Sequence, residues 1–248
     1  MNIIVVGGSS GFGRCIGVGL ARRGARVALL ARGRERLVEA AEEAGAGALP
    51  IVCDVTDQSA CRTAVAEAAT GLGGIDGLVY ATGIGPLRRL ADLDAETWRR
   101  TFDTNVLGAS LITACAIDHL TASRGAAVYL CSVSASLTPP WPGLGAYIVS
   151  KAALDKLVDA WRVEHPSVGF TRLIFGECAG GEGQSRSQFA DGWDAELVAE
   201  LLPLWMARNY VSGSLIDVDE VVRVIHAVLR CGASASIPAV TIAPRARP

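Results

Sequence analysis

The stretch that decides the fold is Val6-Gly7-Gly8-Ser9-Ser10-Gly11-Phe12-Gly13. An apolar run at residues 2–6 precedes it and predicts a short buried strand, while residues 14–23 carry apolar side chains among small ones and predict a helix. The glycines therefore lie on a strand-to-helix turn. Glycine lets the backbone approach a pyrophosphate, and the free amide groups at the start of a helix favour negative charge. The spacing Gly-x-x-x-Gly-x-Gly differs from the commonest nucleotide fingerprint, so the turn alone also fits a glycine-rich loop without a ligand.

Outside this turn, apolar runs and amphipathic segments alternate along the whole chain. Short apolar runs predict further strands at residues 26–31, 49–52, 77–81, 126–132, 169–175 and 239–242. Helical periodicity predicts helices at residues 34–44, 59–70, 97–120, 146–164 and 219–230, the last capped by Asp217 or Asp219. Alternation without hairpin signals predicts the α/β class, with a parallel sheet covered by helices on both faces. Because no linker interrupts the pattern, residues 1–248 are expected to form a single domain that binds its ligands at the carboxyl ends of the strands.

Composition and charge exclude several classes of protein. The formal net charge is −2 and the basic residues are scattered, which predicts no nucleic-acid partner. Met1-Asn2 leads directly into the first strand, and the apolar runs are too short or too interrupted to span a bilayer, so we expect neither secretion nor a membrane partner. The seven cysteines form no CxxC pair and the three histidines are dispersed, which predicts no metal site and a reduced, cytoplasmic protein.

The residues after the second and third predicted strands bear on the choice of dinucleotide. NAD sites on such a sheet usually place an acidic residue after the second strand, whereas an arginine can accept the 2′-phosphate of NADP. Arg32 occupies that position, and the serines of the glycine turn can add a hydroxyl group, so the sequence predicts NADP(H) in preference to NAD(H). The alternative is that Arg32, with Arg34 and Arg36, is the charged start of a surface helix. Asp54 follows the third strand, where a carboxylate can accept the adenine amino group, although an isolated aspartate there is commonly a cap or turn residue.

Tyr147-Ile148-Val149-Ser150-Lys151 is the second informative stretch. Residues four apart share one face of a helix, so Tyr147 and Lys151 are expected to lie one turn apart. A nearby ammonium group stabilises a phenolate and so moves the pKa of a tyrosine toward the range in which it exchanges a proton at neutral pH. Such a tyrosine can protonate a carbonyl oxygen while hydride arrives at the carbon, and a hydroxyl group of Ser132 or Ser134 can hold that oxygen. Alone, a Tyr-x-x-x-Lys pattern also arises by chance on an ordinary helix.

The order and spacing of these motifs resemble the short-chain dehydrogenase/reductase family over nearly the whole chain. The resemblance implies a doubly wound, three-layer sheet (Rossmann fold), a tyrosine that acts as general acid or base, and a lysine that binds the nicotinamide ribose and lowers the tyrosine pKa. It also implies a serine that orients the substrate oxygen, an asparagine that holds a water linking the lysine to a proton relay, and homodimers or homotetramers. The catalytic residues that it implies are Asn105, Ser132, Tyr147 and Lys151. The cofactor-binding residues are Gly7, Ser9, Ser10, Gly11, Phe12, Gly13, Arg32, Asp54, Val55, Ala81, Thr82, Gly83, Tyr147 and Lys151.

Three segments depart from the pattern of that family. Val6 stands where the family usually has threonine, which removes a supporting hydrogen bond beneath the turn. Tyr80-Ala81-Thr82-Gly83 replaces Asn-Asn-Ala-Gly, so different packing against the cofactor is expected there. Gly176-Glu177-Cys178-Ala179-Gly180 replaces the usual Pro-Gly after the sixth strand, which puts the contacts beside the nicotinamide in question.

The catalytic serine has two candidates. Spacing to Tyr147 favours Ser134, whereas the position at the end of the strand favours Ser132. We choose Ser132, because Pro142-Gly143 and the residues that lead into Tyr147 match the family pattern after a two-residue insertion.

Residues 177–215 are expected to form the substrate loop region, entered through glycines. Its large apolar side chains suit a lid over a bulky or aromatic carbonyl compound, although such residues also serve in packing or subunit contacts. They are Phe189, Trp193, Trp205, Met206 and Tyr210, and Trp141 is expected to flank the same pocket. The sequence thus favours an NADPH-dependent carbonyl reductase that acts on a small-molecule ketone or alcohol. The alternative is a non-catalytic dinucleotide-sensing or scaffold protein, which the altered segments motivate.

Overall fold

Seven strands pair in parallel to form one sheet in the part of the chain that the computed structural model describes, residues 1–178, 180–181, 183–211, 213–232 and 234–245. The strands are β1 (Asn2–Val6), β2 (Arg26–Ala31), β3 (Leu49–Val52), β4 (Gly77–Tyr80), β5 (Ala126–Ser132), β6 (Gly169–Phe175) and β7 (Ala239–Ile242). Their order is β3-β2-β1-β4-β5-β6-β7, and each neighbouring pair is parallel. The predicted parallel sheet is confirmed. Its order reverses between β1 and β4, the point at which sheets of this kind bind ligands.

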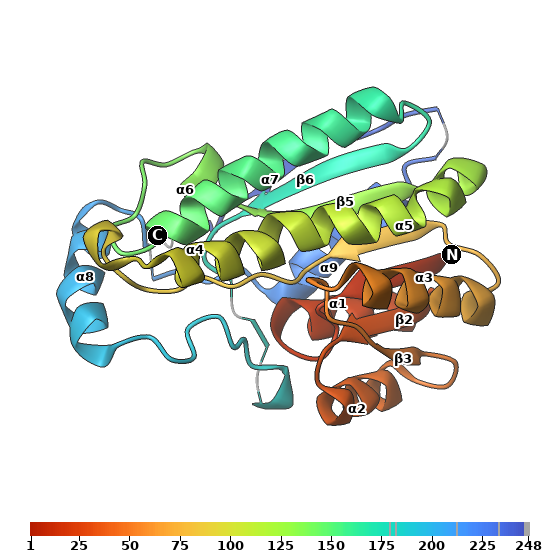
Figure 1. Ribbon diagram of the computed structural model, residues 1–248, viewed down its shortest axis with the longest axis horizontal. Coiled ribbons are helices and arrows are strands. Elements are labelled where there is room, and N and C mark those ends of the chain that lie inside the picture. The colour runs from red at the N-terminus through yellow and green to blue at the C-terminus, as the bar shows by residue number, and fades with distance from the viewer. Residues whose placement is uncertain (179, 182, 212, 233, 246–248) are drawn as a thin grey trace.

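Helices cover both faces of the sheet and give the three predicted layers (Figure 1). Helices α3, α5 and α7 share one apolar cluster with the sheet, and α1, α2 and α9 share a second cluster on the opposite face. These helices are α1 (Gly11–Arg22), α2 (Arg34–Ala44), α3 (Gln58–Leu72), α5 (Gly108–Ser123), α7 (Gly145–Glu164) and α9 (Val218–Leu229). Of the two expected caps of the last helix, the structure selects Asp217, whose side chain accepts a hydrogen bond from the Asp219 N–H.

Strand β1 shows why the sheet needs a cover on each face. Ile3 and Val5 belong to the cluster of α1, α2 and α9, whereas Ile4 and Val6 belong to the cluster of α3, α5 and α7. All four side chains are at most 1% exposed. Because burying an aliphatic side chain of this size contributes about 1.5–3 kcal/mol, a strand with this composition is most stable at the centre of a covered sheet.

The glycine turn closes directly against the start of α1. Gly7 has φ +87°, a left-handed conformation that favours glycine, and the N–H groups of Gly7 and Gly8 donate to the Leu30 carbonyl at 2.7 and 3.1 Å. A Cβ atom on Gly13 would lie 2.1 Å from the Gly7 carbonyl oxygen, so the helix passes the turn at a distance that no side chain permits. Helix α1 accordingly begins at Gly11, inside the glycine stretch, and not at residue 14 as the periodicity predicts.

The prediction of one uninterrupted α-helix at residues 97–120 is wrong at residues 103–107. The structure has α4 (Ala95–Phe102), then a π-helical turn (Asp103–Leu107), and then α5. Apolar side chains continue across the junction, so periodicity alone does not reveal it. A π-helical turn shifts the side chains that follow it around the axis, and this one points Asn105 into the protein, where it is fully buried.

The continuous helical run Ala95–Ser123 is also long and apolar enough, by length and composition alone, to cross a membrane. The expectation that every apolar run is too short or too interrupted therefore does not hold for this segment. One such helix is weak support for a membrane span, because core helices of soluble proteins pass the same test. Its inward side chains from α5 pack in the cluster shared with α3 and α7.

The predicted substrate loop region contains a helix, α8 (Ala195–Ala207), in place of a continuous loop. Asp194 caps this helix by accepting a hydrogen bond from the Leu197 N–H. Helix α8 lies beside the first turns of α4 and α7 (Figure 1), and its Leu201 and Trp205 join a third apolar cluster with residues from the start of α7. The remaining short elements are α6 (Val133–Ser136) and two 3₁₀ turns, Leu90–Asp92 and Gly183–Ser185.

The contact of Gly13 with Gly7 generates a stability prediction. Gly13→Ala places a methyl group 2.1 Å from a carbonyl oxygen of the backbone, so the turn and α1 must separate. We expect a loss of about 1–3 kcal/mol in the free energy of unfolding, measured by urea denaturation. Gly169→Ala is the matched control, because its methyl group meets no atom closer than Ala126 Cβ, at 3.4 Å, and its stability should stay within about 0.5 kcal/mol of the wild type. Equal stability of the two variants would contradict the packing described here.

Candidate active site

A cavity of about 1030 Å³ lies at the carboxyl ends of the strands and extends from Arg32 to Trp205. Most of the residues predicted from the sequence line it. They are Gly7, Ser9, Ser10, Gly11, Phe12, Arg32, Asp54, Val55, Ala81, Thr82, Gly83, Ser132, Tyr147 and Lys151. Gly13 and Asn105 lie behind its wall, where they support the glycine turn and the segment after β4. The parallel sheet therefore brings both predicted motifs into one cavity.

One end of the cavity carries Arg32 and Asp54. Arg32 follows β2 and is exposed, with its side chain on the cavity wall. Asp54 follows β3, and its Oδ1 accepts hydrogen bonds from the N–H and the Oγ1 of Thr56 at 2.9 and 2.8 Å. The carboxylate thus shapes a turn, as the alternative interpretation expected, and still borders the cavity.

The opposite end gathers Tyr147, Lys151 and two serines. Ser132 ends β5, and its Oγ lies 2.8 Å from the Oγ of Ser134 and also hydrogen-bonds the Tyr147 side chain. Lys151 Nζ donates to the Leu130 carbonyl at 2.7 Å and lies 5.9 Å from the centroid of the Tyr147 ring. The serine in contact with the tyrosine is therefore Ser132, and Ser134 contacts that serine in turn.

Burial dominates the pKa values of this group. It raises the pKa of Tyr147 to about 12, against the lowering effect of the hydrogen bond from Ser132. It lowers the pKa of Lys151, against the raising effects of Cys131 and Asp155. The lowered tyrosine pKa expected from the lysine is therefore not found in this structure, because desolvation of the phenolate outweighs the other effects.

Asn105 is fully buried and holds the segment after β4. Its Nδ2 donates to the Ile84 carbonyl at 2.9 Å and to the Ser150 Oγ at 2.8 Å, while its Oδ1 accepts from the Ile84 N–H at 2.8 Å. Ser150 Oγ in turn donates to the Tyr147 carbonyl at 2.7 Å. The amide group of Asn105 thus joins the cavity wall to the helix that carries Tyr147, and its expected contact with a water stays a prediction.

Residues between 187 and 193, within the predicted substrate loop region, line the cavity, and their approach to the glycine turn is a feature that the motifs do not reveal. Ser10 Oγ donates to Gln188 Oε1 at 3.4 Å, and a Cβ on Gly11 would lie 3.2 Å from Ser187 Cα. The Phe189 ring then meets the Tyr147 ring edge-on, with 5.0 Å between the centroids. No sequence signal marks Ser187 or Gln188, since they approach the glycine turn only through the fold.

Aromatic side chains form the wall beside Tyr147. Trp193 packs against Phe189 and Trp205, with centroid distances of 5.6 and 6.2 Å, and Trp141 packs against Trp205 at 5.7 Å. Indole N–H groups fix this wall, because Trp193 Nε1 donates to the Gly85 carbonyl and Trp205 Nε1 to the Pro142 carbonyl. Of the other large residues predicted for the pocket, Tyr210 stacks on Trp141 and Met206 is exposed, and neither lines the cavity.

The segments that depart from the expected family pattern differ in whether they reach the cavity. Tyr80 is fully buried in the cluster beneath the sheet and does not line the cavity, so only its neighbours reach the site. Gly176, Glu177 and Cys178 line the cavity, and Ala179 lies outside the described residues. Among the described residues no group of three or more histidine, cysteine or acidic side chains is placed to hold a metal ion.

Comparisons with known proteins agree with this geometry. A family profile described as short chain dehydrogenase matches residues 1–173. The 11-beta-hydroxysteroid dehydrogenase A of Sesamum indicum is 34% identical over 180 residues, which cover 70% of this chain and 51% of that protein. The chain thus spans about half the length of the curated relatives that it matches.

Two solved structures share the fold over nearly the whole chain. One is an alcohol dehydrogenase from Thermococcus sibiricus complexed with 5-hydroxy-NADP, with a TM-score of 0.80, 22% identity, and coverage of 97% of this chain and 94% of the other. The second is a 3-ketoacyl-(acyl-carrier-protein) reductase from Brucella melitensis complexed with NADH, with a TM-score of 0.80, 21% identity, and coverage of 97% and 96%.

The contacts of Asn105 generate a second prediction. Asn105→Ala leaves the Ile84 N–H and carbonyl without their partner inside the protein. We expect the free energy of unfolding to fall by about 2–4 kcal/mol in urea denaturation. Asp118→Ala, at an exposed position of α5, is the control and should change it by less than about 0.5 kcal/mol. If both variants unfold alike, Asn105 does not support the cavity wall.

Proposed function

Since this chain belongs to the short chain dehydrogenase family, we propose that it is an NADPH-dependent carbonyl reductase that transfers hydride between NADP(H) and a ketone or alcohol. The observation that carries the proposal is the meeting of two motifs: Ser132, Tyr147 and Lys151 border the same cavity as the glycine turn. Fold alone does not establish activity, so the proposal rests on these side chains.

The cavity fits a dinucleotide. The glycine turn offers backbone N–H groups and the start of α1 to a pyrophosphate, and the lack of room for a Cβ on Gly13 keeps that turn tight. Gly83 has a similar role beside Lys151, because a Cβ there would lie 3.3 Å from its Nζ. We assign the adenosine half to the end with Arg32 and Asp54, and the nicotinamide half to the end with Lys151. When bound, NADPH supplies the hydride.

The preference for NADP(H) is argued from this chain alone, because one structural neighbour was solved with an NADP analogue and another with NADH. Arg32 is exposed on the cavity wall directly after β2, where the ribose 2′-position of a bound dinucleotide is expected. A guanidinium group can grip a phosphate through two parallel hydrogen bonds. Arg36 borders the same end of the cavity and adds to its positive charge.

Tyr147, Ser132 and Lys151 have different roles in the proposed proton transfer. A phenol whose pKa is raised to about 12 keeps its proton at neutral pH, so Tyr147 is suited to donate that proton to a carbonyl oxygen. Ser132, in contact with Tyr147, is placed to hold the same oxygen. An ammonium group on Lys151 favours the phenolate that remains after the proton has left. The same groups serve alcohol oxidation in the reverse direction.

The aromatic wall indicates a bulky, neutral and preferably aromatic or polycyclic substrate. Phe189, Trp193 and Trp205 present flat apolar faces beside Tyr147. Among the described residues that line the cavity, the cationic side chains other than Lys151 are Arg32 and Arg36, at the adenosine end. No cation is thus left among them to pair with an acidic substrate. The relative from Sesamum indicum is named for a hydroxysteroid, a substrate of this polycyclic kind.

We extend the proposal to a cytoplasmic homodimer or homotetramer without a membrane or nucleic-acid partner. The seven cysteines are all free thiols, which suits a reducing compartment. Leu107, after α4, and Val149, on α7, are apolar side chains that remain 45% and 48% exposed in one subunit. Contacts between subunits would remove these two side chains from water.

The proposed role of Tyr147 predicts a separation of catalysis from binding. Tyr147→Phe should lower kcat for a neutral bicyclic ketone by at least about 100-fold, because the proton donor is lost. The dissociation constant of NADPH, followed by nicotinamide fluorescence, should change by less than about threefold, because Arg32 and the glycine turn are intact. The wild type should prefer that ketone to a short keto acid of equal concentration. NADPH binding without turnover by the wild type would favour the non-catalytic alternative, and full activity of the variant would refute the mechanism.

The proposed role of Arg32 predicts a change in cofactor selectivity. Arg32→Ala should weaken NADPH binding by about 10–100-fold, since charge-assisted hydrogen bonds to a phosphate are lost, and leave NADH binding nearly unchanged. Arg34→Ala is the control, because Arg34 is exposed at the start of α2 and does not line the cavity. Equal losses for both cofactors in Arg32→Ala would remove the 2′-phosphate contact from the proposal.

A further inference from the structure

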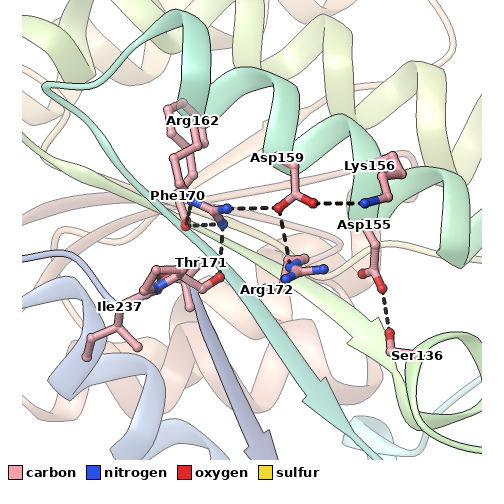
Figure 2. Close-up of polar contacts among 10 residues, drawn as sticks. Ser136, Asp155, Lys156, Asp159, Arg162, Phe170, Thr171, Arg172 and Ile237 are labelled. Atoms are coloured by element: carbon pink, nitrogen blue, oxygen red, sulfur yellow. Dashed lines mark hydrogen bonds and ion pairs between the residues drawn. The ribbon is translucent and has the colours of Figure 1, made fainter.

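Asp155 is a buried carboxylate that the proposed mechanism does not use. It lies on α7, is 6% exposed, and accepts a hydrogen bond from Ser136 of α6 through Oδ2 (Figure 2). Its Oδ1 is buried and has no hydrogen-bond partner among the described residues. A carboxylate removed from water in this way is costly unless a positive charge or donors compensate it. The position therefore calls for a physical reason.

Lys151 lies on the same helix, one turn before Asp155, where residues four apart share one face. Among the described residues, the other titratable groups around the two side chains are Tyr147, whose ring centroid lies 5.9 Å from Lys151 Nζ, Cys131 of β5, whose thiol Asp155 acts on electrostatically, and Arg172 of β6, which acts on the same thiol. Arg172 is already turned toward Asp159, at 3.7 Å (Figure 2). Helix α6 carries no charged residue, and its Ser136 donates the hydrogen bond to Asp155. The negative charge of Asp155 acts on Lys151 and raises its pKa against the effect of burial, so Asp155 is placed to serve as a counter-charge of Lys151.

The hydrogen bond to Ser136 connects Asp155 to the catalytic serine as well. Helix α6 begins directly after Ser132, whose side chain accepts a hydrogen bond from the Ser134 N–H and whose Oγ lies 2.8 Å from the Ser134 Oγ. Ser136 is the last residue of this four-residue helix. Asp155 therefore fixes the far end of the short element that orients Ser132.

We propose that Asp155 is a positioning residue of the active site, a buried carboxylate that fixes α6 through Ser136 and serves as the counter-charge of Lys151. The inference rests on the proposed function, in which Ser132 and Lys151 act on the substrate and the tyrosine. Asp155 itself lies outside the cavity lining and touches no reacting atom. It acts through the neutral Ser136 and the charged Lys151. Each of these two effects can be removed by a separate substitution.

The electrostatic route has a definite sign. Burial lowers the pKa of Lys151, and the negative charge of Asp155 opposes this shift. Removing that charge lowers the pKa of Lys151 further, so the ammonium group loses its proton at lower pH. The route through Ser136 has no such effect, because a serine carries no charge.

The chain contains two lysines, Lys151 and Lys156, so NMR of protein labelled with ¹³C-lysine reports their titrations directly. In Asp155→Asn we expect the titration midpoint of Lys151 to fall by about one pH unit, a tenfold weaker hold on the proton. The midpoint of Lys156, whose side chain is 86% exposed, should not move. Lys156→Arg assigns the two signals. An unmoved Lys151 midpoint in Asp155→Asn overturns the electrostatic part of the proposal.

Asp159→Asn is the matched control, one turn further along α7. Asp159 pairs with Arg162 at 2.8 Å, Lys156 at 3.6 Å and Arg172 at 3.7 Å (Figure 2), so its loss disturbs the same helix without approaching Lys151. This variant should leave the Lys151 titration at its wild-type midpoint. An equal shift in both variants would mean a general loosening of α7, which contradicts a specific role for Asp155.

Ser136→Ala tests the second route and keeps the charge of Asp155. We expect kcat for ketone reduction to fall about tenfold, because α6 is no longer fixed, with the NADPH dissociation constant and the Lys151 midpoint unchanged. An unchanged kcat in Ser136→Ala overturns the proposed fixing of α6 by Asp155. This test does not depend on Asp155→Asn, so it also applies if that variant fails to fold. In Asp155→Asn the alkaline limb of the profile of kcat/KM against pH should move with the Lys151 midpoint. If the wild type shows no Tyr147-dependent turnover, the proposed function fails, and the NMR titrations still decide the role of Asp155.

Discussion

Parallel pairing of every strand is the constraint on which the rest of the structure depends. It places all carboxyl ends at one edge of the sheet, where residues far apart in the chain meet around one cavity. These residues are Gly7, Arg32, Asp54, Ala81, Ser132 and Gly176. Parallel strands bury both faces, so the near-continuous apolar composition of β1, β4 and β5 and the position of the site have the same cause.

Helix α7 supplies the second constraint, because its turns set the distance of each functional group from the cavity. Tyr147, Lys151, Asp155 and Asp159 follow one another at intervals of four residues on the same helix. The last of them lies among arginines that tie α7 to the neighbouring strands: Arg162 donates to the carbonyls of Phe170 and Pro238 (Figure 2 shows the contact with Phe170). Hydrogen bonds thus fix α7 at both ends, at its far end through Arg162 and at its first turns through Ser150, which Asn105 joins to the cavity wall.

The strands, the sheet type and the placement of most predicted site residues at the cavity follow from the sequence, because apolar runs and glycine spacing are local signals. The π-helical turn at Asn105 does not, since the amide group that it points inward pairs with Ile84, a contact between separate segments. The approach of Ser187 and Gln188 to the glycine turn is non-local in the same way. The raised pKa of Tyr147 could not be predicted from the sequence either. The spacing of the motif places a lysine nearby, but only the packing shows how far the phenol is removed from water.

Burial shifts the pKa values of Tyr147 and Lys151, and the two shifts have different consequences for the stability of the fold. The raised pKa of Tyr147 means that its contribution to stability is present at neutral pH and is lost only as the pH rises above the ordinary tyrosine range. The lowered pKa of Lys151 has the opposite effect on stability. Below the ordinary lysine pKa, the folded state binds the proton of Lys151 less readily than the unfolded chain does. The ammonium group of Lys151 therefore lowers the stability of the fold throughout the neutral range. The electrostatic cost of the site at neutral pH therefore falls on the lysine. A buried negative charge one turn away reduces that cost and keeps the proton that the chemistry needs, which explains why a carboxylate is retained in the interior beside it.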